Sequence, residues 1–252
     1  PLSADWENVK GLTAADLRPD DRWILARLNA TVRATTRGLE GFRFNDVARV
    51  LYEFMWNEFC DWYLESAKAV FNSDDAALRA RTLRVFDHVM GTFLRLLHPI
   101  MPFVTEELYH QMGYVSATDS IMQAAWPKAF DARTAKRLGA TEETVTRVTA
   151  RCELIRSVRN VRAQYLIPDG RRIAVVVAPA DEGAAAFLQE DTLSLQSLLY
   201  AAGIDIRPGY QPDGPCGVAV SALGTAYIPL ADVIDLEAER ARLRKQQDET
   251  AG

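Results

Sequence analysis

The sequence contains few residues that could bind a metal or form a disulfide. Its three cysteines are widely separated, and no two of them form a C-x-x-C pair. An odd number of scattered cysteines argues against a disulfide framework and against a zinc cluster. The histidines show no metal-ligand spacing, and His98 precedes Pro99, where a role at a helix end is expected. We therefore expect no metal site.

Long hydrophobic runs are also missing. The longest aliphatic-rich run, residues 173–180, is far too short to span a bilayer. Residues 1–10 lack the basic-then-apolar pattern of a signal peptide. These absences predict a cytoplasmic location and no membrane partner. The chain begins at Pro1 rather than at a methionine, which indicates a fragment of a longer protein.

The motifs of a self-sufficient enzyme are absent from the sequence. It has no nucleophile elbow, no metal-ligand spacing and no Gly-rich phosphate loop. Glu106 and Glu107 are a pair of carboxylates, but adjacent residues of a helix do not face each other. We expect no catalytic residue and no cofactor in this chain.

The charge is slightly negative overall and strongly positive in one segment. The net charge of −5 argues against a protein that attracts nucleic acid over its whole surface. Residues 133–172, however, contain ten basic and four acidic residues, a net charge of +6. A phosphate backbone would be attracted to this segment. A composition of 48% hydrophobic and 25% charged residues is ordinary for a globular protein.

Apolar spacing predicts a helical first half. A helix should begin after Pro19, with Asp20 and Asp21 in its first turn, and end near residues 38–41. A long helix over residues 42–68 should follow, with Asn45 or Asp46 as N-cap. Its wide apolar arc predicts contacts with two or more neighbours. The arc combines a main stripe with a second set to its side (Phe44, Val47, Leu51, Phe54, Met55, Phe59 and Trp62; Tyr52, Trp56, Cys60 and Tyr63).

Further along, the sequence predicts three more helical segments and then a change of period. A helix should run from Asp74 or Asp75 to Leu97, and a short one over residues 103–112. After a loop over 114–131, Thr141 should cap a helix that ends before Pro168. Residues 173–178, 204–207, 217–223 and 226–229 are strand-like, with a helix over 181–202. They predict a small α+β module with a mostly antiparallel sheet.

Three long motifs carry a resemblance to a known family. They are DRWILARLN at 21–29, LYEFMWNEFCDWYLESAK at 51–68 and LLHPIMPFVTEELY at 96–109. In this order they closely resemble the anticodon-binding helical domain of class I valyl-tRNA synthetases. The resemblance implies a mainly α chain with three parts. They are a helical-bundle anticodon-binding domain over 1–134, a small α+β module with a leading basic helix over 135–232, and the start of a truncated coiled-coil arm over 233–252.

The resemblance also implies a function and its partners. Such a chain would bind the anticodon arm of tRNA(Val), as a monomer, while upstream catalytic and editing domains of the same chain carry out ATP-dependent aminoacylation. The His-x-Gly-His and Lys-Met-Ser-Lys-Ser motifs of the family's ATP site do not occur here. ATP is therefore expected to bind the full-length enzyme only, and the chain alone should be inactive.

The family reads anticodon bases near the ends of the first two helices, which here are joined by Phe42-Arg43-Phe44. Aromatic and basic side chains suit unpaired RNA bases and their phosphates. Phe44 also begins the apolar stripe, so we expect it in the core and favour Phe42 and Arg43. Basic residues of the first helix and of the +6 segment complete the predicted tRNA-binding set (Arg33, Arg37, Phe42, Arg43, Arg151, Arg159 and Arg162).

Two alternatives remain open at this point. The equivalent region of isoleucyl-tRNA synthetase shares the bundle but usually continues into a cysteine-rich zinc-binding tail, and this chain has no cysteine pair. A helical interaction module without RNA function would instead use Arg33 and Arg37 as an ordinary solvated basic face. Alanine substitution of Arg33 and Arg43 tests this second alternative, because in a tRNA-binding chain it should weaken RNA binding without lowering the melting temperature.

Overall fold

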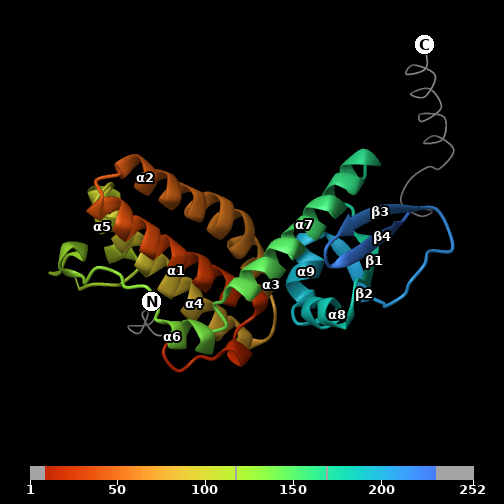
Figure 1. Cartoon of the computed structure of the whole chain (residues 1–252), viewed down its shortest axis with the longest axis horizontal. Helices are drawn as coiled ribbons and strands as arrows, with labels where there is room; N and C mark the ends of the chain where they lie inside the picture. The colour runs from red at the N-terminus through yellow and green to blue at the C-terminus, as the bar shows by residue number, and fades with distance from the viewer. Residues whose placement is uncertain (1–8, 117, 169, 231–252) are drawn as a thin grey trace, which may run out of the picture. The chain divides into compact units, whose positions relative to one another are not determined.

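The computed structural model describes residues 9–116, 118–168 and 170–230. Contacts divide the chain into two units, residues 1–146 and 147–252, and Figure 1 shows a helical unit and a unit built around a sheet. The division falls inside helix α7 (Glu142–Gln164). The expected boundary, between residues 134 and 135, lies before this helix. The predicted coiled-coil arm over 233–252 lies outside the described residues.

The first long helix, α1 (Pro19–Glu40), has the predicted bounds. Proline fits the first helical position, and the two aspartates that follow it favour the positive end of the helix dipole. The buried face carries Ile24, Leu25, Leu28 and Val32, each at most 4% exposed. A short 3₁₀ turn, η1 (Ala14–Asp16), precedes the helix.

The predicted long helix is present over residues 44–71. It consists of α2 (Phe44–Glu53), a π-helical stretch η2 (Phe54–Leu64) and α3 (Glu65–Phe71). The wider π turns suit the spacing of Phe54, Phe59 and Tyr63, which are all buried. The N-cap position is occupied by Arg43, so the expectation of Asn45 or Asp46 is wrong.

Part of the predicted second apolar set is exposed. Tyr52 and Trp56 are 62% and 53% exposed, and their rings lie next to each other with centroids 6.3 Å apart. Tyr63 of the same set is fully buried. The long helix does pack against both α1 and α4, but its buried arc is narrower than the sequence suggests.

The remaining helices complete the unit. Helix α4 (Ala76–Leu97) begins at the predicted cap, because the Asp75 side chain accepts a hydrogen bond from the Leu78 amide (2.9 Å). Helix α5 (Pro102–Gln111) follows the double-proline corner, where His98 Nδ1 lies 2.8 Å from Thr105 Oγ1. Two short elements, η3 (Ile121–Gln123) and α6 (Ala132–Arg137), were not predicted.

A buried polar network ties the start of α1 to the long helix. Arg18 pairs with Asp21 at 2.8 Å, and both side chains are at most 4% exposed. The Tyr63 hydroxyl donates to Asp21 Oδ1 (3.0 Å). Burial and the neighbouring Asp21 charge raise the pKa of Tyr63 well above its usual value, so the hydroxyl stays protonated. Ser66 joins the network by accepting from Arg18 and donating to Asp20.

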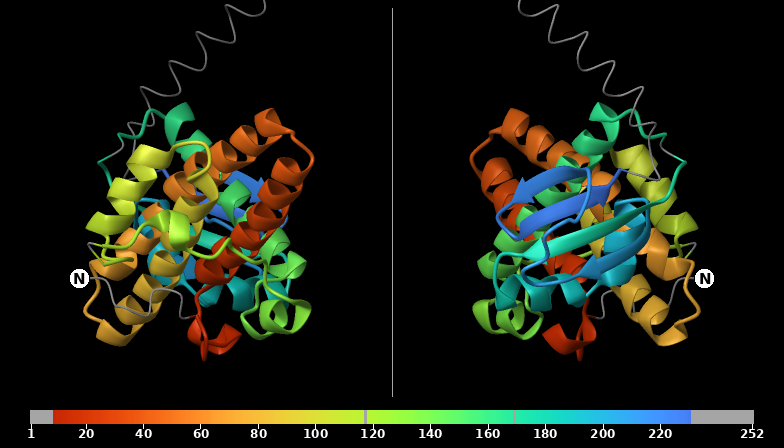
Figure 2. Two further views of the ribbon diagram at one scale, coloured as in Figure 1. Left: turned by 90° about the vertical axis from the view of Figure 1, so that its left-hand side faces the viewer. Right: turned by 90° about the vertical axis from the view of Figure 1, so that its right-hand side faces the viewer.

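The second unit packs helices against a four-stranded sheet. The strands are β1 (Ile173–Pro179), β2 (Ala201–Ile206), β3 (Cys216–Ser221) and β4 (Gly224–Pro229). Their order is β2-β1-β4-β3, which can be followed in Figure 2. Strands β1 and β2 pair in parallel and the other two pairs are antiparallel. The sheet is thus mostly antiparallel, as predicted. Gly217 allows β3 to approach α7, because a Cβ there would lie 2.5 Å from Val161 Cγ1.

The predicted helix over 181–202 is two helices, α8 (Glu182–Gln189) and α9 (Thr192–Leu198). Asp191 separates them, since its side chain accepts a hydrogen bond from the Ser194 amide (3.0 Å) and caps α9. The chain then enters β2 at Ala201, before the predicted start. None of the described helices combines the length and apolar character that a membrane crossing requires.

The buried network generates the first prediction. Substitution Tyr63→Phe should lower the free energy of unfolding by about 1–3 kcal/mol, because Asp21 loses a donor without access to water. Urea unfolding followed by circular dichroism measures this change. The matched substitution Tyr52→Phe, at an exposed tyrosine, should have an effect within about 0.5 kcal/mol. Equal effects of the two substitutions would contradict the role given to the network.

Candidate nucleic-acid interface

The turn between α1 and α2 is closed by a Schellman motif. The Arg43 amide donates to the Gly38 carbonyl (2.8 Å) and the Phe42 amide to the Leu39 carbonyl (3.1 Å). This pattern places Phe42 at the position that usually holds glycine, in the left-handed region with φ 56°. The helices come close before the turn, since a Cβ on Gly38 would lie 2.5 Å from Val47 Cγ2. A bulky aromatic residue therefore occupies a strained position.

Two phenylalanine rings project from this turn into solvent. Phe42 is 80% exposed and Phe44 is 57% exposed, and their rings meet edge to face with centroids 6.4 Å apart. The expectation that Phe44 lies in the core is wrong. Phe44 is the first residue of α2, and burial on this helix begins one turn later, at Val47. Both rings are thus available for stacking, whereas the sequence predicted this role for Phe42 only.

Basic residues lie close to these two phenylalanines along the chain. Arg43 is exposed and only weakly paired with Asp46, with 3.8 Å between Nε and Oδ2. Arg37 is exposed on the last turns of α1, where its Nε donates to the Arg33 carbonyl (3.3 Å). Arg33 lies one turn earlier, also exposed, and uses Nη2 to donate to the Phe130 carbonyl (3.0 Å). Four predicted residues, Arg33, Arg37, Phe42 and Arg43, thus follow one another along α1 and its turn.

A shallow hollow runs beside the two α1 arginines. We call it the α1 groove; it has a volume of about 380 Å³ and is lined by Val32, Arg33, Thr36 and Arg37 of α1 and by residues 126–129. The Trp126 indole anchors this segment to α1 by donating to Thr36 Oγ1 (2.9 Å). The sequence predicts only a loop here. The Trp-Pro-Lys run at 126–128 has the same aromatic-and-basic character as Phe42-Arg43 and could have indicated the groove.

The sequence pattern does not indicate one further exposed aromatic side chain. Phe103, in the first turn of α5, is 90% exposed. Figure 1 shows α5 and the α1–α2 turn at the same end of the helical unit. In the sequence, this residue lies in a motif whose prolines suggest only a structural corner.

Arg27 is a basic residue of α1 with a structural role. Its Nη2 lies 2.6 Å from Glu58 Oε1 of η2, and the side chains are 37% and 18% exposed. The hydrogen bond to Glu58 raises the pKa of Arg27, while burial raises the pKa of Glu58 against the pull of the arginine. The pair holds α1 against the long helix. Arg27 therefore differs in role from the exposed arginines further along α1.

The predicted arginines of the second unit are engaged in its fold. Arg151 is 2% exposed and lies over the Phe187 ring (5.9 Å). Arg162 is 5% exposed and its Nη2 donates to two carbonyls of the turn before β1, 2.8 Å from that of Arg171. Both guanidinium groups are buried, so the structure gives these two residues a role in the fold, and their contact with tRNA stays a prediction. Arg159 is exposed but donates to the Leu198 carbonyl at the end of α9 (2.8 Å).

Comparison with known proteins gives two findings. Residues 21–177 match the model of a family described as the anticodon-binding domain of tRNA ligase. A valine–tRNA ligase of Latilactobacillus sakei is 36% identical over 91% of this chain and 25% of its own length. One of Carboxydothermus hydrogenoformans is 36% identical over 95% of this chain and 27% of its own length. The chain thus spans about a quarter of the length of these relatives.

The strained turn generates the second prediction. Substitution Phe42→Gly should raise the free energy of unfolding by about 1 kcal/mol relative to Phe42→Ala, because only glycine adopts the left-handed region without a Cβ penalty. Phe42→Ala should stay within about 0.5 kcal/mol of the unsubstituted chain, since the ring contributes little buried contact. Urea unfolding measures both. A loss of more than about 2 kcal/mol in Phe42→Ala would mean that the ring is a packing residue.

Proposed function

Because the chain belongs to the anticodon-binding domain family of tRNA ligases, we propose that it holds the anticodon arm of valine tRNA as part of a valine–tRNA ligase. Binding of tRNA follows from the family. The choice of valine is supported by relatives named valine–tRNA ligase that align with nine-tenths or more of the chain. The observation that carries the location of the site is the pair of exposed rings on a strained, arginine-flanked turn.

The proposed site combines stacking with charge. Anticodon bases are unpaired, so their faces can stack on the exposed rings of Phe42 and Phe44. Arg37, on the last turns of α1, and Arg43, next to Phe42 in the chain, are exposed and supply positive charge for the phosphates between the bases. The turn is held in place by the Schellman bonds and by the contact of Gly38 with Val47. A rigid turn loses little entropy on binding, which favours recognition of a particular loop shape.

The contribution to aminoacylation would be positional. Holding the anticodon arm orients the acceptor end of the tRNA, so binding energy serves alignment rather than bond making. We assign ATP-dependent chemistry to catalytic and editing domains outside this chain, so the residues of this chain contribute binding and not catalysis. The proposal includes a cytoplasmic, monomeric protein. Arg159, exposed and near the end of α7, remains a proposed second contact with tRNA.

The third prediction tests RNA binding by the chain. The 252-residue protein should bind a synthetic valine anticodon arm at about 50 mM salt, with affinity falling linearly on a log–log plot against salt. Substitutions Arg37→Ala and Arg43→Ala should each weaken binding and reduce the salt slope by about 1, because each removes one phosphate contact. Fluorescence anisotropy of a labelled arm measures both quantities.

A matched control uses Lys68, which is exposed near the C-terminal end of the long helix and pairs with Glu65 (2.6 Å). Lys68→Ala removes the same charge and should leave affinity within about twofold, because the site lies at the other end of that helix. If Arg37→Ala and Arg43→Ala leave the affinity and the salt slope unchanged, the proposed site is overturned. Equal binding of an isoleucine anticodon arm would overturn the choice of valine.

A further inference from the structure

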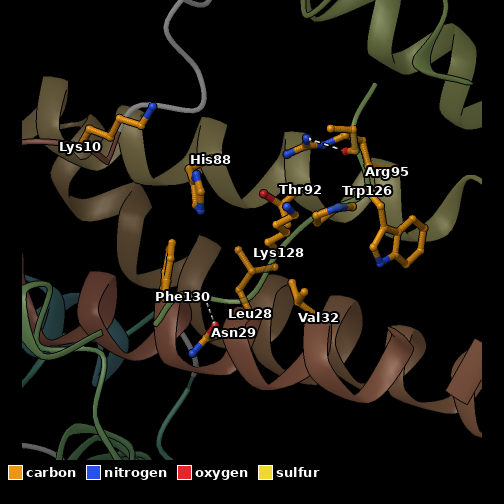
Figure 3. Close-up of a pocket in the computed structure, with 12 residues that line it drawn as sticks. Lys10, Leu28, Asn29, Val32, His88, Thr92, Arg95, Trp126, Lys128 and Phe130 are labelled. Atoms are coloured by element: carbon orange, nitrogen blue, oxygen red, sulfur yellow. Dashed lines mark hydrogen bonds between the residues drawn. The ribbon is translucent and has the colours of Figure 1, made fainter. Parts of the chain in front are cut away.

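The helical unit contains a second hollow, larger than the α1 groove. We call it the α4 pocket; it has a volume of about 490 Å³ and lies between α1, α4 and the segment around Trp126 (Figure 3). This volume is within the range of pockets that hold small ligands, about 300–1,000 Å³. Its lining comes from four parts of the chain (Lys10; Leu28, Asn29 and Val32; His88, Thr92 and Arg95; Ala125–Lys128 and Phe130).

The charge of this lining selects an anionic ligand. Lys10, Arg95 and Lys128 all line the pocket, whereas the described lining includes no aspartate or glutamate. Lys10 and Lys128 are exposed, and neither forms an ion pair with any residue in the part of the chain that the structure describes. Arg95 is held against the wall of the pocket, where Nη1 donates to the Ala125 carbonyl (3.1 Å). Two exposed ammonium groups therefore stand at a hollow whose described lining contributes no carboxylate.

The shape and polarity of the lining select a flat, aromatic ligand. The His88 and Phe130 rings stack with centroids 5.5 Å apart and an interplanar angle of 17°. Figure 3 shows these rings on one side of the pocket and the Trp126 indole on the other, with Leu28 and Val32 between them on α1. The backbone around Phe130 is fixed, because its amide donates to Asn29 Oδ1 (2.6 Å). Flat rings and aliphatic side chains are the surfaces on which nucleic-acid bases stack.

The α4 pocket continues into the α1 groove. Both hollows are lined by Val32, Trp126, Pro127 and Lys128. The α1 residues that line them, from Leu28 to Arg37, recur at spacings of three and four and so form one face of the helix. This face extends for about 14 Å, from the pocket to the last turn before Phe42. A strand of RNA leaving the α1–α2 turn along Arg37 and Arg33 would reach the pocket.

We infer that the α4 pocket accepts one unstacked nucleotide of the RNA bound at the α1–α2 turn, with its base among His88, Phe130 and Trp126 and its phosphate beside Lys10 and Lys128. This inference rests on the proposed function and extends it to a second subsite. A base without a phosphate would leave Lys10 and Lys128 without a ligand group, and a phosphate without a base would leave the rings uncovered.

A mononucleotide titration tests the pocket without the anticodon arm. Adenosine 5′-monophosphate, added to the 252-residue protein, should shift the Trp126 indole and His88 ring signals in NMR spectra and saturate at millimolar concentration, on the order of −4 kcal/mol of binding free energy. Adenosine and ribose 5-phosphate should each bind at least about threefold more weakly, because each lacks one of the two recognised groups. Signals are assigned from Trp126→Phe and His88→Gln spectra.

Substitutions then separate the pocket from the turn. Lys10→Glu should weaken adenosine 5′-monophosphate binding about three- to tenfold, since it places an acid at the phosphate position. Lys136→Glu, at an exposed lysine of α6 outside the pocket lining, should change it less than twofold. Phe42→Ala should weaken binding of the anticodon arm and leave the mononucleotide titration unchanged. Circular dichroism melting of each variant should match that of the unsubstituted chain.

The outcomes distinguish the two proposals. No saturable shift up to about 10 mM nucleotide, with arm binding intact, would overturn the pocket and leave the proposed function standing. If the unsubstituted chain does not bind the anticodon arm but still gives a saturable mononucleotide titration, the proposed function is overturned, and the pocket is a nucleotide site that does not serve the anticodon arm. Equal binding of adenosine 5′-monophosphate and ribose 5-phosphate would show a site for anions only and would overturn the assignment to a nucleotide.

Discussion

Packing of α1 against the long helix of residues 44–71 is the constraint on which the helical unit depends. It is fixed at one end by the buried Arg18–Asp21–Tyr63 network and at the other by the contact of Gly38 with Val47. The chain must reverse direction within residues 41–43, and the Schellman bonds force the left-handed conformation on Phe42. The stability of the network supports this local strain, and the strain holds an aromatic ring out in solvent.

Arginine residues have two different roles in this chain, and burial separates them. Arg18, Arg151 and Arg162 are at most 6% exposed and hold elements together through carboxylate, ring and carbonyl partners. Arg37 and Arg43 are exposed at the end of α1, where their partners are a neighbouring carbonyl and a distant carboxylate. The most basic segment of the sequence therefore includes two arginines, Arg151 and Arg162, that are buried in the fold. The proposed RNA surface lies instead on a helix whose local charge is unremarkable.

Exposed aromatic rings are costly in water unless a partner covers them. Phe42, Phe44 and Phe103 project from elements at one end of the helical unit, and Trp126 lines both hollows beside α1. Stacking on unpaired bases provides such a partner, because every base has a flat apolar face. The same surface carries lysine and arginine side chains along its length, which gives the phosphates between those bases a matching charge.

The sequence by itself determined the helices, most of the strands, and the resemblance in three long motifs. Apolar period, prolines and N-caps such as Asp75 are local signals, and the structure confirms the elements that they predict. Only the tertiary structure decided which faces are covered. The apolar period places Phe44 in the main stripe of the long helix and Tyr52 and Trp56 in the second set beside it. It does not show whether a neighbouring helix covers that part of either set. For the same reason Arg151 reads as a surface charge in sequence and is buried in the fold. The hollows beside α1 depend on contacts such as Trp126 with Thr36, ninety residues apart, and no local pattern specifies a contact of that range.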